Sequence, residues 1–371
     1  MSRESVEART LREWLERGER VTVVDVRHAE EHAEWAIPGS VNFDVYDELK
    51  AGDRDAMQSL DVPKDGPLVT VCGVGRSSAV AAEQLRQRGY EALTLEGGMQ
   101  AWSLAWNSAE VPVEGTEARV IQVRRTGKGC LSYLVGSDSE AAVIDASVEP
   151  EVYLELADSY GWEITRVFDT HLHADHLSRS RKLAELSGAT LDLPEGTPVS
   201  YRYSSIQDGD ALETGVARFD ALHTAGHTTE STSYLLDGRA LFTGDTLFLA
   251  GVGRPDLEAS PQEARAKAYW LYGTLMRLLA LPPETLVLPG HTNEPVPFDG
   301  EPLFATLGEV HDRVGLLHEG EDAFVEKLMA NLSPTPQNHA RIVELNKAGV
   351  LPEEDPTELE AGANRCAVSS S

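Results

Sequence analysis

Seven side chains of types that bind metal ions occur in succession between positions 171 and 291. Four lie within Thr170–His176, and the other three follow at wider intervals. The full set is His171, His173, Asp175, His176, His227, Asp245 and His291. Imidazole nitrogens and carboxylate oxygens together are ligands for transition metals such as zinc or iron. The series therefore predicts a buried metal centre, with hydrogen-bonded core or surface histidines as the alternative. Outside this series, His28, His32, His311, His318 and His339 are interpreted as surface groups.

The elements expected around these residues would bring them to one edge of the fold. The apolar run Ile164–Phe168 predicts a strand just before the first histidine, and we expect a helix to begin near His176. Similar runs end at or just before the later candidates; they are Ala217–Leu222, Ala240–Asp245 and Thr285–Gly290. Every candidate ligand is thus expected at the end of a strand.

A second candidate site centres on Cys72, between an expected strand at 68–72 and an expected helix at 77–88. The connecting loop reads Cys72-Gly73-Val74-Gly75-Arg76-Ser77-Ser78. Its glycines allow consecutive backbone amides to turn inward and bind an anion, and Arg76 adds a positive charge. The helix amino terminus acts in the same direction, so the thiolate is favoured over the thiol. The loop predicts a reactive cysteine, with a buried cysteine before an ordinary turn as the alternative.

Composition limits the classes of protein. The chain has 371 residues, 41% of them hydrophobic, which suffices for two or three globular domains. We expect a cytoplasmic protein, because no membrane span or signal peptide is evident. Three scattered cysteines, Cys72, Cys130 and Cys366, do not form a disulfide framework, and Cys130 and Cys366 are interpreted as packed residues.

The net charge is −29, from 61 acidic against 32 basic residues. Nucleic acid is therefore an improbable partner. Such a balance is typical of proteins from organisms with molar salt in the cytoplasm, although an acidic protein of an ordinary organism is the alternative.

The chain divides into two differently patterned regions at the polar joint 111–118. Before the joint, strands alternate with helices, which predicts an α/β domain with a parallel sheet and flanking helices over residues 1–114. After it, short strands follow in close succession, which predicts a sheet-on-sheet core with helices outside over residues 118–371.

The first region resembles the rhodanese domain over about residues 5 to 107. The Cys72, Gly75, Arg76 and Ser77 pattern matches the active-site loop of that family, with one residue fewer between cysteine and arginine. Further matches are Asp25-Val26-Arg27, Ile37–Asn42 and Glu96-Gly97-Gly98 before Trp102. The resemblance implies that Cys72 accepts sulfane sulfur as a persulfide. Gly73, Gly75 and Ser77 would stabilise the charged sulfur, and Arg76 would hold an anionic donor or acceptor.

The second region resembles the metallo-β-lactamase superfamily, an αββα sandwich, and within it the persulfide dioxygenases. Besides the metal-binding series, the stretch Gly251–Leu257 with Arg254 and Asp256 matches those enzymes, as do Asn331–Gln337 and Asn364-Arg365-Cys366. The resemblance implies one Fe(II) per chain on His171, His227 and Asp245. A face of two histidines and one carboxylate leaves positions open for a persulfide sulfur and dioxygen.

The other four candidates, His173, Asp175, His176 and His291, would then support the ligands or hold a second ion. The main alternative is a hydrolase similar to glyoxalase II, with two Zn(II) ions and a thioester substrate. A sulfur carrier with a vestigial metal fold is the third hypothesis.

The resemblance implies oxidation of a small thiol persulfide by O₂ to sulfite, coupled to sulfane-sulfur transfer through Cys72. The expected partners are the persulfide, O₂, and thiosulfate or sulfite, with no nucleic acid and no membrane. A homodimer is compatible with the sequence. Arg254 is expected to contact substrate or to pair with Asp256.

Overall fold

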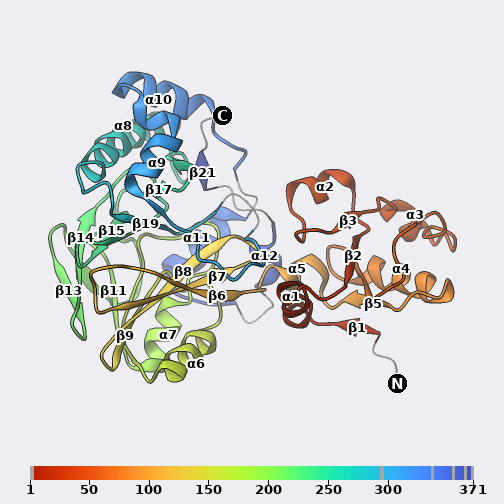
Figure 1. Cartoon of the computed structure of the whole chain (residues 1–371). Coiled ribbons are helices and arrows are strands. Elements are labelled where there is room, and N and C mark those ends of the chain that lie inside the picture. Colours follow the sequence, from red (N-terminus) through yellow and green to blue (C-terminus); the bar gives the residue numbers. More distant parts are fainter. Residues whose placement is uncertain (1–3, 293–295, 336–337, 353–355, 363–365, 369–371) are drawn as a thin grey trace.

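The computed structural model describes residues 4–292, 296–335, 338–352, 356–362 and 366–368. Two lobes are visible, joined near α5 and α12 (Figure 1). Parts of the sequence motifs at positions 336–337 and 364–365 lie outside the described residues.

The first domain is a five-stranded sheet in the order β1-β5-β4-β2-β3, and every pairing in it is parallel. Its strands are β1 (Ser5–Val6), β2 (Thr22–Asp25), β3 (Val41–Asn42), β4 (Leu68–Val71) and β5 (Ala92–Leu95). Its helices are α1 (Ala8–Glu16), α2 (Ala29–Glu34), α3 (Tyr46–Ala51), α4 (Arg76–Gln87) and α5 (Gly98–Trp102). Strand β4 is buried throughout, as expected of a central parallel strand with helices on both faces. The predicted α/β class is confirmed.

The second domain has two large sheets and a small one. The first runs β12-β11-β10-β9-β8-β7-β6, the second β13-β14-β15-β16-β19-β20, and the third β17-β18-β21. The strands of the first sheet are β6 (Asn107–Val111), β7 (Arg119–Arg125), β8 (Cys130–Ser137), β9 (Glu140–Ile144), β10 (Glu163–Phe168), β11 (Thr190–Pro194) and β12 (Ser204–Ile206). Those of the others are β13 (Ala211–Thr214), β14 (Ala217–His223), β15 (Thr232–Leu236), β16 (Ala240–Gly244), β17 (Leu247–Phe248), β18 (Gly251–Gly253), β19 (Leu286–Pro289), β20 (Ala305–Thr306) and β21 (Ala367–Val368).

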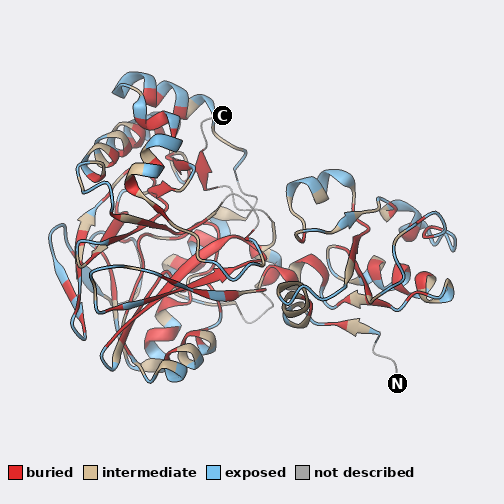
Figure 2. Cartoon of the chain, viewed as in Figure 1, coloured by how far each residue is buried: buried red, intermediate tan, exposed pale blue. Residues whose placement is uncertain are grey.

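Successive side chains along a strand of the first large sheet point to opposite faces, which explains why the sheet packs on both sides. On β8, Leu131, Tyr133 and Val135 face the second sheet, while Leu134 faces outward toward a helix. Phe219 and Phe242 come from the opposing sheet into the same central core. Both faces of β8 are therefore apolar and buried (Figure 2).

Helices cover the outer faces of both sheets. Helix α6 (Pro150–Tyr160) and α7 (Ser180–Ser187) pack on the first sheet through residues such as Tyr153 and Leu183. The other face carries α8 (Pro261–Leu278), α9 (Leu307–Arg313), the 3₁₀ turn η1 (Gly315–His318) and α10 (Glu321–Ala330), while α11 (His339–Ala348) and α12 (Thr357–Glu360) follow. The predicted αββα sandwich is confirmed.

Two local features differ from the sequence expectations. The helix expected near His176 begins only at Ser180. Residues 177 and 178 are instead held by side chains from the C-terminal region, since Leu177 N donates to Glu360 and Ser178 N donates to Asn346. The domain boundary at 111–118 remains a prediction, but β6 ahead of it already pairs with β7.

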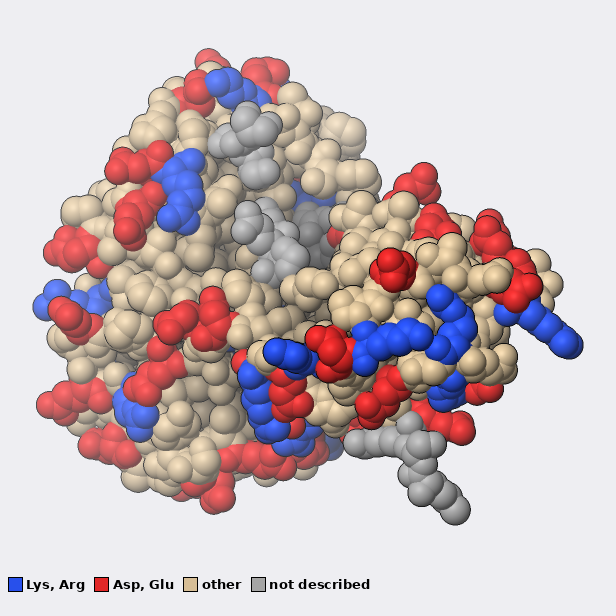
Figure 3. Space-filling model, turned by 45° about the vertical axis from the view of Figure 1, so that its right-hand side comes forward, with Lys and Arg blue, Asp and Glu red and all other residues tan. Residues whose placement is uncertain are grey.

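Surface charge agrees with the acidic composition. On the face in Figure 3, lysines and arginines lie among aspartates and glutamates over the area of both domains. No described helix is both long and apolar enough to cross a membrane.

Candidate metal centre and cysteine loop

Three of the predicted ligands converge at the ends of different strands. His171 follows β10, His227 follows β14, and Asp245 directly follows β16. Asp245 Oδ2 lies 3.8 Å from His171 Nε2 and 3.7 Å from His227 Nε2, and all three side chains are buried. Within the residues that the structure describes, neither His171 Nε2 nor Asp245 Oδ2 has a hydrogen-bond partner. Buried polar atoms that lack partners yet face one another are the arrangement expected of a ligand set for a metal.

Hydrogen bonds from outside this triad fix the direction of both imidazole rings. Thr170 Oγ1 donates to Asp145 Oδ2 at 2.9 Å, so it accepts from His171 Nδ1, also at 2.9 Å. His227 Nδ1 donates to the carbonyl oxygen of Arg254 at 2.8 Å. A proton on Nδ1 leaves the lone pair on Nε2 of each ring, which is the nitrogen that faces Asp245.

The protonation states of the triad suit metal binding. Burial lowers the pKa of His171 well below its usual range and lowers that of His227 as well. Burial opposes ionisation of Asp245, but the charge and hydrogen bond of His291 outweigh it and lower the pKa of that carboxyl. Two neutral imidazoles and a carboxylate are the forms that coordinate a cation.

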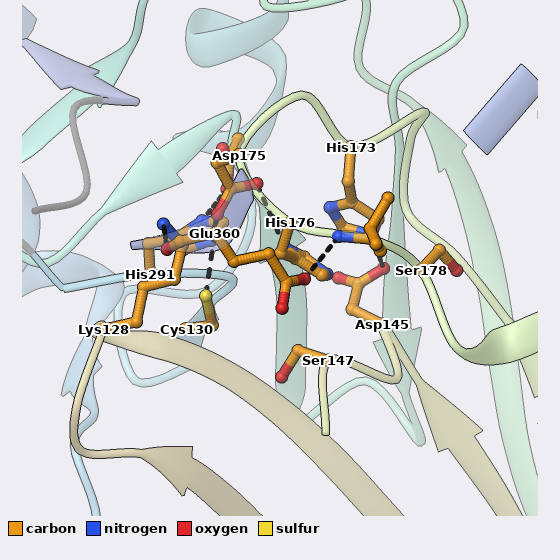
Figure 4. A network of polar contacts seen from close by, with 12 residues as sticks. Lys128, Cys130, Asp145, Ser147, His173, Asp175, His176, Ser178, His291 and Glu360 are labelled. Atoms are coloured by element: carbon orange, nitrogen blue, oxygen red, sulfur yellow. Dashed lines mark hydrogen bonds and ion pairs between the residues drawn. The ribbon is translucent and has the colours of Figure 1, made fainter. Parts of the chain in front are cut away.

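A second group lies beside the triad and consists of Cys130, Asp175, His176 and His291 (Figure 4). His291 links two carboxylates, with Nδ1 hydrogen-bonded to Asp245 Oδ1 at 2.5 Å and Nε2 paired with Asp175 Oδ2 at 2.7 Å. Asp175 also contacts His176 Nδ1 at 3.0 Å and Cys130 Sγ at 3.6 Å. Burial opposes protonation of His291, but Asp175 and Asp245 raise its pKa well above the usual range. His291 therefore links the carboxylates of Asp175 and Asp245.

His173 belongs to neither group. Its Nε2 lies 3.2 Å from Asp145 Oδ1, and it clusters with Asp145 and Asp169. Asp145 thus orients two histidines, one through Thr170 and one directly. Asp145 is not among the residues predicted for the site, although it shares with the other candidates a place at the end of a strand-like run. Cys130, which we had interpreted as a packed residue, gave no such signal, because its contact with Asp175 spans 45 positions.

The guanidinium of Arg254 is already engaged by other residues. It forms a bidentate pair with Asp256, both contacts at 2.8 Å, and donates to the carbonyl of Ser333. The side chain is buried. Of the two roles expected for Arg254, this geometry favours the structural pair, and the Arg254 carbonyl orients His227 as well.

A pocket of about 350 Å³ opens at His227. Leu172, Leu257 and Trp270 contribute apolar surface, while Lys267 and Lys347 lie among Glu230, Glu258 and Glu263. The pocket therefore offers a small ligand apolar surface and charged groups of both signs beside His227.

The cysteine loop of the first domain lies between β4 and α4. Cys72 is buried, and its sulfur accepts a hydrogen bond from Ser78 N at 3.4 Å. Gly75 precedes α4 with φ +86°, a backbone conformation that glycine adopts without strain. Gly73, Arg76 and Ser77 lie in the same turn, with Arg76 exposed at the first position of the helix. The structure therefore brings all five predicted residues into one loop at the carboxyl edge of the parallel sheet.

Comparison with known proteins identifies both domains. Residues 7–105 match the model of the rhodanese-like domain, and residues 125–291 match that of the metallo-beta-lactamase superfamily. A hydroxyacylglutathione hydrolase of Maricaulis maris is 35% identical over 156 residues, which are 41% of this chain and 57% of that protein. The corresponding protein of Brucella anthropi is 34% identical over 155 residues, or 41% of this chain and 53% of that protein. The chain thus spans little more than half the length of these curated relatives.

Two solved structures share the fold of the second domain. A metallo-beta-lactamase from Staphylococcus aureus is 26% identical with a TM-score of 0.58, covering 64% of this chain and 74% of that one. ETHE1 from Myxococcus xanthus is 30% identical with a TM-score of 0.56, covering 62% of this chain and 98% of that one. The chain belongs to the metallo-beta-lactamase superfamily and carries a rhodanese-like domain ahead of its metal-binding domain.

Proposed function

We propose that the chain is a metal-dependent enzyme that oxidises a low-molecular-weight thiol persulfide with O₂, giving sulfite and the thiol. The overall reaction is RSSH + O₂ + H₂O → RSH + H₂SO₃, in which the outer sulfur is oxidised and dioxygen is reduced. The observation that carries the proposal is the geometry of the triad. His171, His227 and Asp245 present three converging atoms, while His291 has both ring nitrogens engaged by carboxylates.

The triad fits a single Fe(II). Two imidazoles and one carboxylate are the ligands of mononuclear non-haem iron oxygenases, in which the iron offers open positions to a substrate sulfur and to dioxygen. The hydrogen bonds of Thr170 and of the Arg254 carbonyl hold the two rings in place. The pocket at His227 would hold the persulfide, with Leu257 and Trp270 excluding water from the sulfur and Lys267 or Lys347 binding a carboxylate of the carrier thiol.

The rhodanese-like domain would exchange sulfane sulfur through Cys72. A thiosulfate donor would leave sulfite and a Cys72 persulfide, and sulfite as acceptor would run the same step in reverse. In either direction Arg76 would attract the anion, and the amides of the Gly73–Ser77 turn, together with that of Ser78, would stabilise the charged sulfur. We also propose that the protein occurs in the cytoplasm and forms a homodimer.

A thioester hydrolase with two Zn(II) ions is the second candidate. The group formed by Cys130, Asp175, His176 and His291 favours it, since it could hold another cation beside the triad. The curated relatives are named hydroxyacylglutathione hydrolases, which agrees with that chemistry.

Metal analysis of anaerobically purified protein distinguishes these candidates when it is combined with two assays, O₂ uptake on glutathione persulfide and hydrolysis of a glutathione thioester. We expect one iron per chain and persulfide-dependent uptake. The His227→Ala variant should lose the metal, whereas His176→Ala should retain one iron per chain. Two zinc ions in the wild type, one of them lost in His176→Ala together with thioester hydrolysis, would reject the dioxygenase proposal.

A further inference from the structure

A cavity of about 390 Å³ lies between the two domains, and residues of both line it. The first domain contributes Arg27, Trp35, Gly73 and Gln100, and the second contributes Lys128 and Asp175. Its volume is in the range of cavities that hold small molecules. We name it the interdomain cavity.

One wall of the interdomain cavity is the cysteine loop. Gly73 lines the cavity directly after Cys72 in the chain. Met99 and Gln100, which also line it, donate backbone hydrogen bonds to the carbonyls of Cys72 and Gly73, at 2.9 and 3.1 Å. This is the carboxyl edge of the parallel sheet, where ligands bind in open α/β folds.

The opposite wall belongs to the metal centre. Ala174 and Asp175 line the interdomain cavity, and Asp175 is linked through His291 to the triad carboxylate Asp245. Ala174 also lines the pocket that contains His227. A single loop, the one that carries the metal-binding histidines, therefore separates the interdomain cavity from the substrate pocket.

Direct contacts hold the two walls in this orientation. Trp35 Nε1 donates to the carbonyl of Gly127 at 2.8 Å, and Arg125 Nε donates to that of Ser103 at 2.6 Å. A side chain at Gly127 would come within 1.8 Å of the Trp102 carbonyl oxygen, so the junction is closely packed. The cysteine loop and the histidine-rich loop therefore form opposite walls of one cavity in the resting protein.

Charged residues of both signs line the interdomain cavity: Arg27 and Lys128 are positive, and Glu31, Glu34 and Asp175 are negative. Lys128 is buried, and its Nζ donates to the backbone carbonyl of Glu360 at 2.8 Å. The Glu360 carboxylate is already paired with Arg125 and Arg179. The positive charge of Lys128 thus remains to attract a thiolate or persulfide anion in a chain that is otherwise strongly acidic.

We propose that the interdomain cavity binds a low-molecular-weight thiol and passes its persulfide from Cys72 to the metal centre without release. The thiolate of the carrier attacks the outer sulfur of the Cys72 persulfide, so that a carrier S–S bond forms and the Cys72 S–S bond breaks. Cys72 leaves as the thiolate, and no net oxidation occurs in this step. The carrier persulfide then moves past Ala174 to the pocket at His227. This inference rests on the proposed dioxygenase function and gives the sulfur transfer a direction.

Isotope dilution in the iron-loaded full chain tests the transfer. The protein receives glutathione and thiosulfate labelled with ³⁴S at the outer sulfur only, together with unlabelled glutathione persulfide, and labelled sulfite is measured. An equimolar mixture of Cys72→Ser and Asp245→Asn chains is the reference, because its persulfide must pass through solution. At micromolar bulk persulfide, the wild type should form more than about ten times as much labelled sulfite as the mixture. The reason is that a ligand confined between two linked sites has an effective concentration of about millimolar.

Filling the interdomain cavity should abolish the excess of labelled sulfite that the wild type forms over the mixture. Ala361 lines the cavity, and Ala361→Trp should lower labelled sulfite to the level of the mixture while O₂ uptake on added persulfide is retained. Gln100→Trp fills the cavity from the opposite wall with the same expected result. Ala348→Trp, in an unrelated hollow beside Tyr201, is the matched control and should behave as the wild type.

The outcomes separate the two proposals. If the unlabelled persulfide dilutes the label in sulfite equally in the wild type and in the mixture, direct transfer is overturned. This comparison holds even if the tryptophan variants do not fold. Lack of O₂ uptake by the wild type on added persulfide overturns the dioxygenase function, and the transfer with it.

Discussion

The cysteine loop and the metal centre are assembled in opposite ways. The loop is a contiguous segment, residues 72–78, in which a backbone amide and a helix start surround one sulfur. The metal centre draws its triad from three strand ends, and its supporting contacts extend to Glu360 near the end of the chain. Local backbone geometry therefore determines the first site, whereas tertiary packing of buried charges determines the second.

The largest expected effects test whether the two sites are chemically independent. Asp245→Asn should lose iron and reduce persulfide-dependent O₂ uptake by more than about 100-fold, because removing a ligand costs more than removing its supporting contacts. Cys72→Ser should reduce thiosulfate-dependent sulfur transfer to the rate without enzyme. Each variant should retain the other activity, measured as O₂ uptake on added persulfide or as sulfur transfer to cyanide. Loss of both activities in either variant would show that the sites are not separable.

The next largest effect tests how far the stability of the metal-binding domain depends on buried charge. Glu360 is buried, and its carboxylate binds Arg125, Arg179 and the amide of Leu177. Glu360→Gln would leave buried Arg125 without its counter-ion and Arg179 with only the half-exposed Glu149, so the free energy of unfolding should fall by about 3–5 kcal/mol. Urea unfolding followed by tryptophan fluorescence measures this loss.

Glu149→Gln is the matched control, because half-exposed Glu149 lies 3.5 Å from the same Arg179. It should cost less than about 1 kcal/mol. Equal costs in both variants would indicate that burial of the ion pair is not what stabilises this region.

The contribution of Glu360 should also depend on pH. Burial opposes its ionisation, but Arg125 and Arg179 outweigh that effect and lower the pKa of Glu360 in the folded chain. A lowered folded pKa means that the stabilisation is complete above the unfolded value of about 4.3 and is lost as the pH falls toward the folded value. The difference in unfolding free energy between wild type and Glu360→Gln should therefore be constant near pH 7 and shrink below about pH 4. A difference that grew on acidification would contradict this sign.

The smallest effect on stability tests the backbone geometry of the cysteine loop. Gly75 and Gly89 have nearly the same φ, +86° and +84°, so alanine at either position should cost about 1–2 kcal/mol. At Gly75 the added Cβ would also lie 3.2 Å from the Leu95 carbonyl oxygen, whereas at Gly89 no atom lies within 4 Å.

Only Gly75→Ala should therefore displace the loop and reduce sulfur transfer, by about tenfold or more. O₂ uptake on added persulfide should be unchanged in both variants. Equal rates of sulfur transfer in the two variants would show that the reactivity of Cys72 does not depend on the conformation of the loop.

The contrast between the sites also explains what could be predicted from the sequence. The strands that end before His171, His227 and Asp245 were predictable from short apolar runs, and the cysteine loop from its glycines. The orientation of His173 toward Asp145 was not predictable from the sequence, because it depends on the register between neighbouring strands. Likewise, the late start of α7 at Ser180 results from side chains of Asn346 and Glu360, about 170 to 180 positions away, which capture amides that would otherwise enter the helix.

The position of Glu360 has a consequence for biosynthesis. This residue lies 183 positions after Leu177, yet its carboxylate holds the backbone immediately after the histidine-rich loop. Until Glu360 has left the ribosome it cannot reach Leu177, although the rhodanese-like domain is by then fully synthesised. The cysteine loop should thus fold earlier in translation than the metal centre.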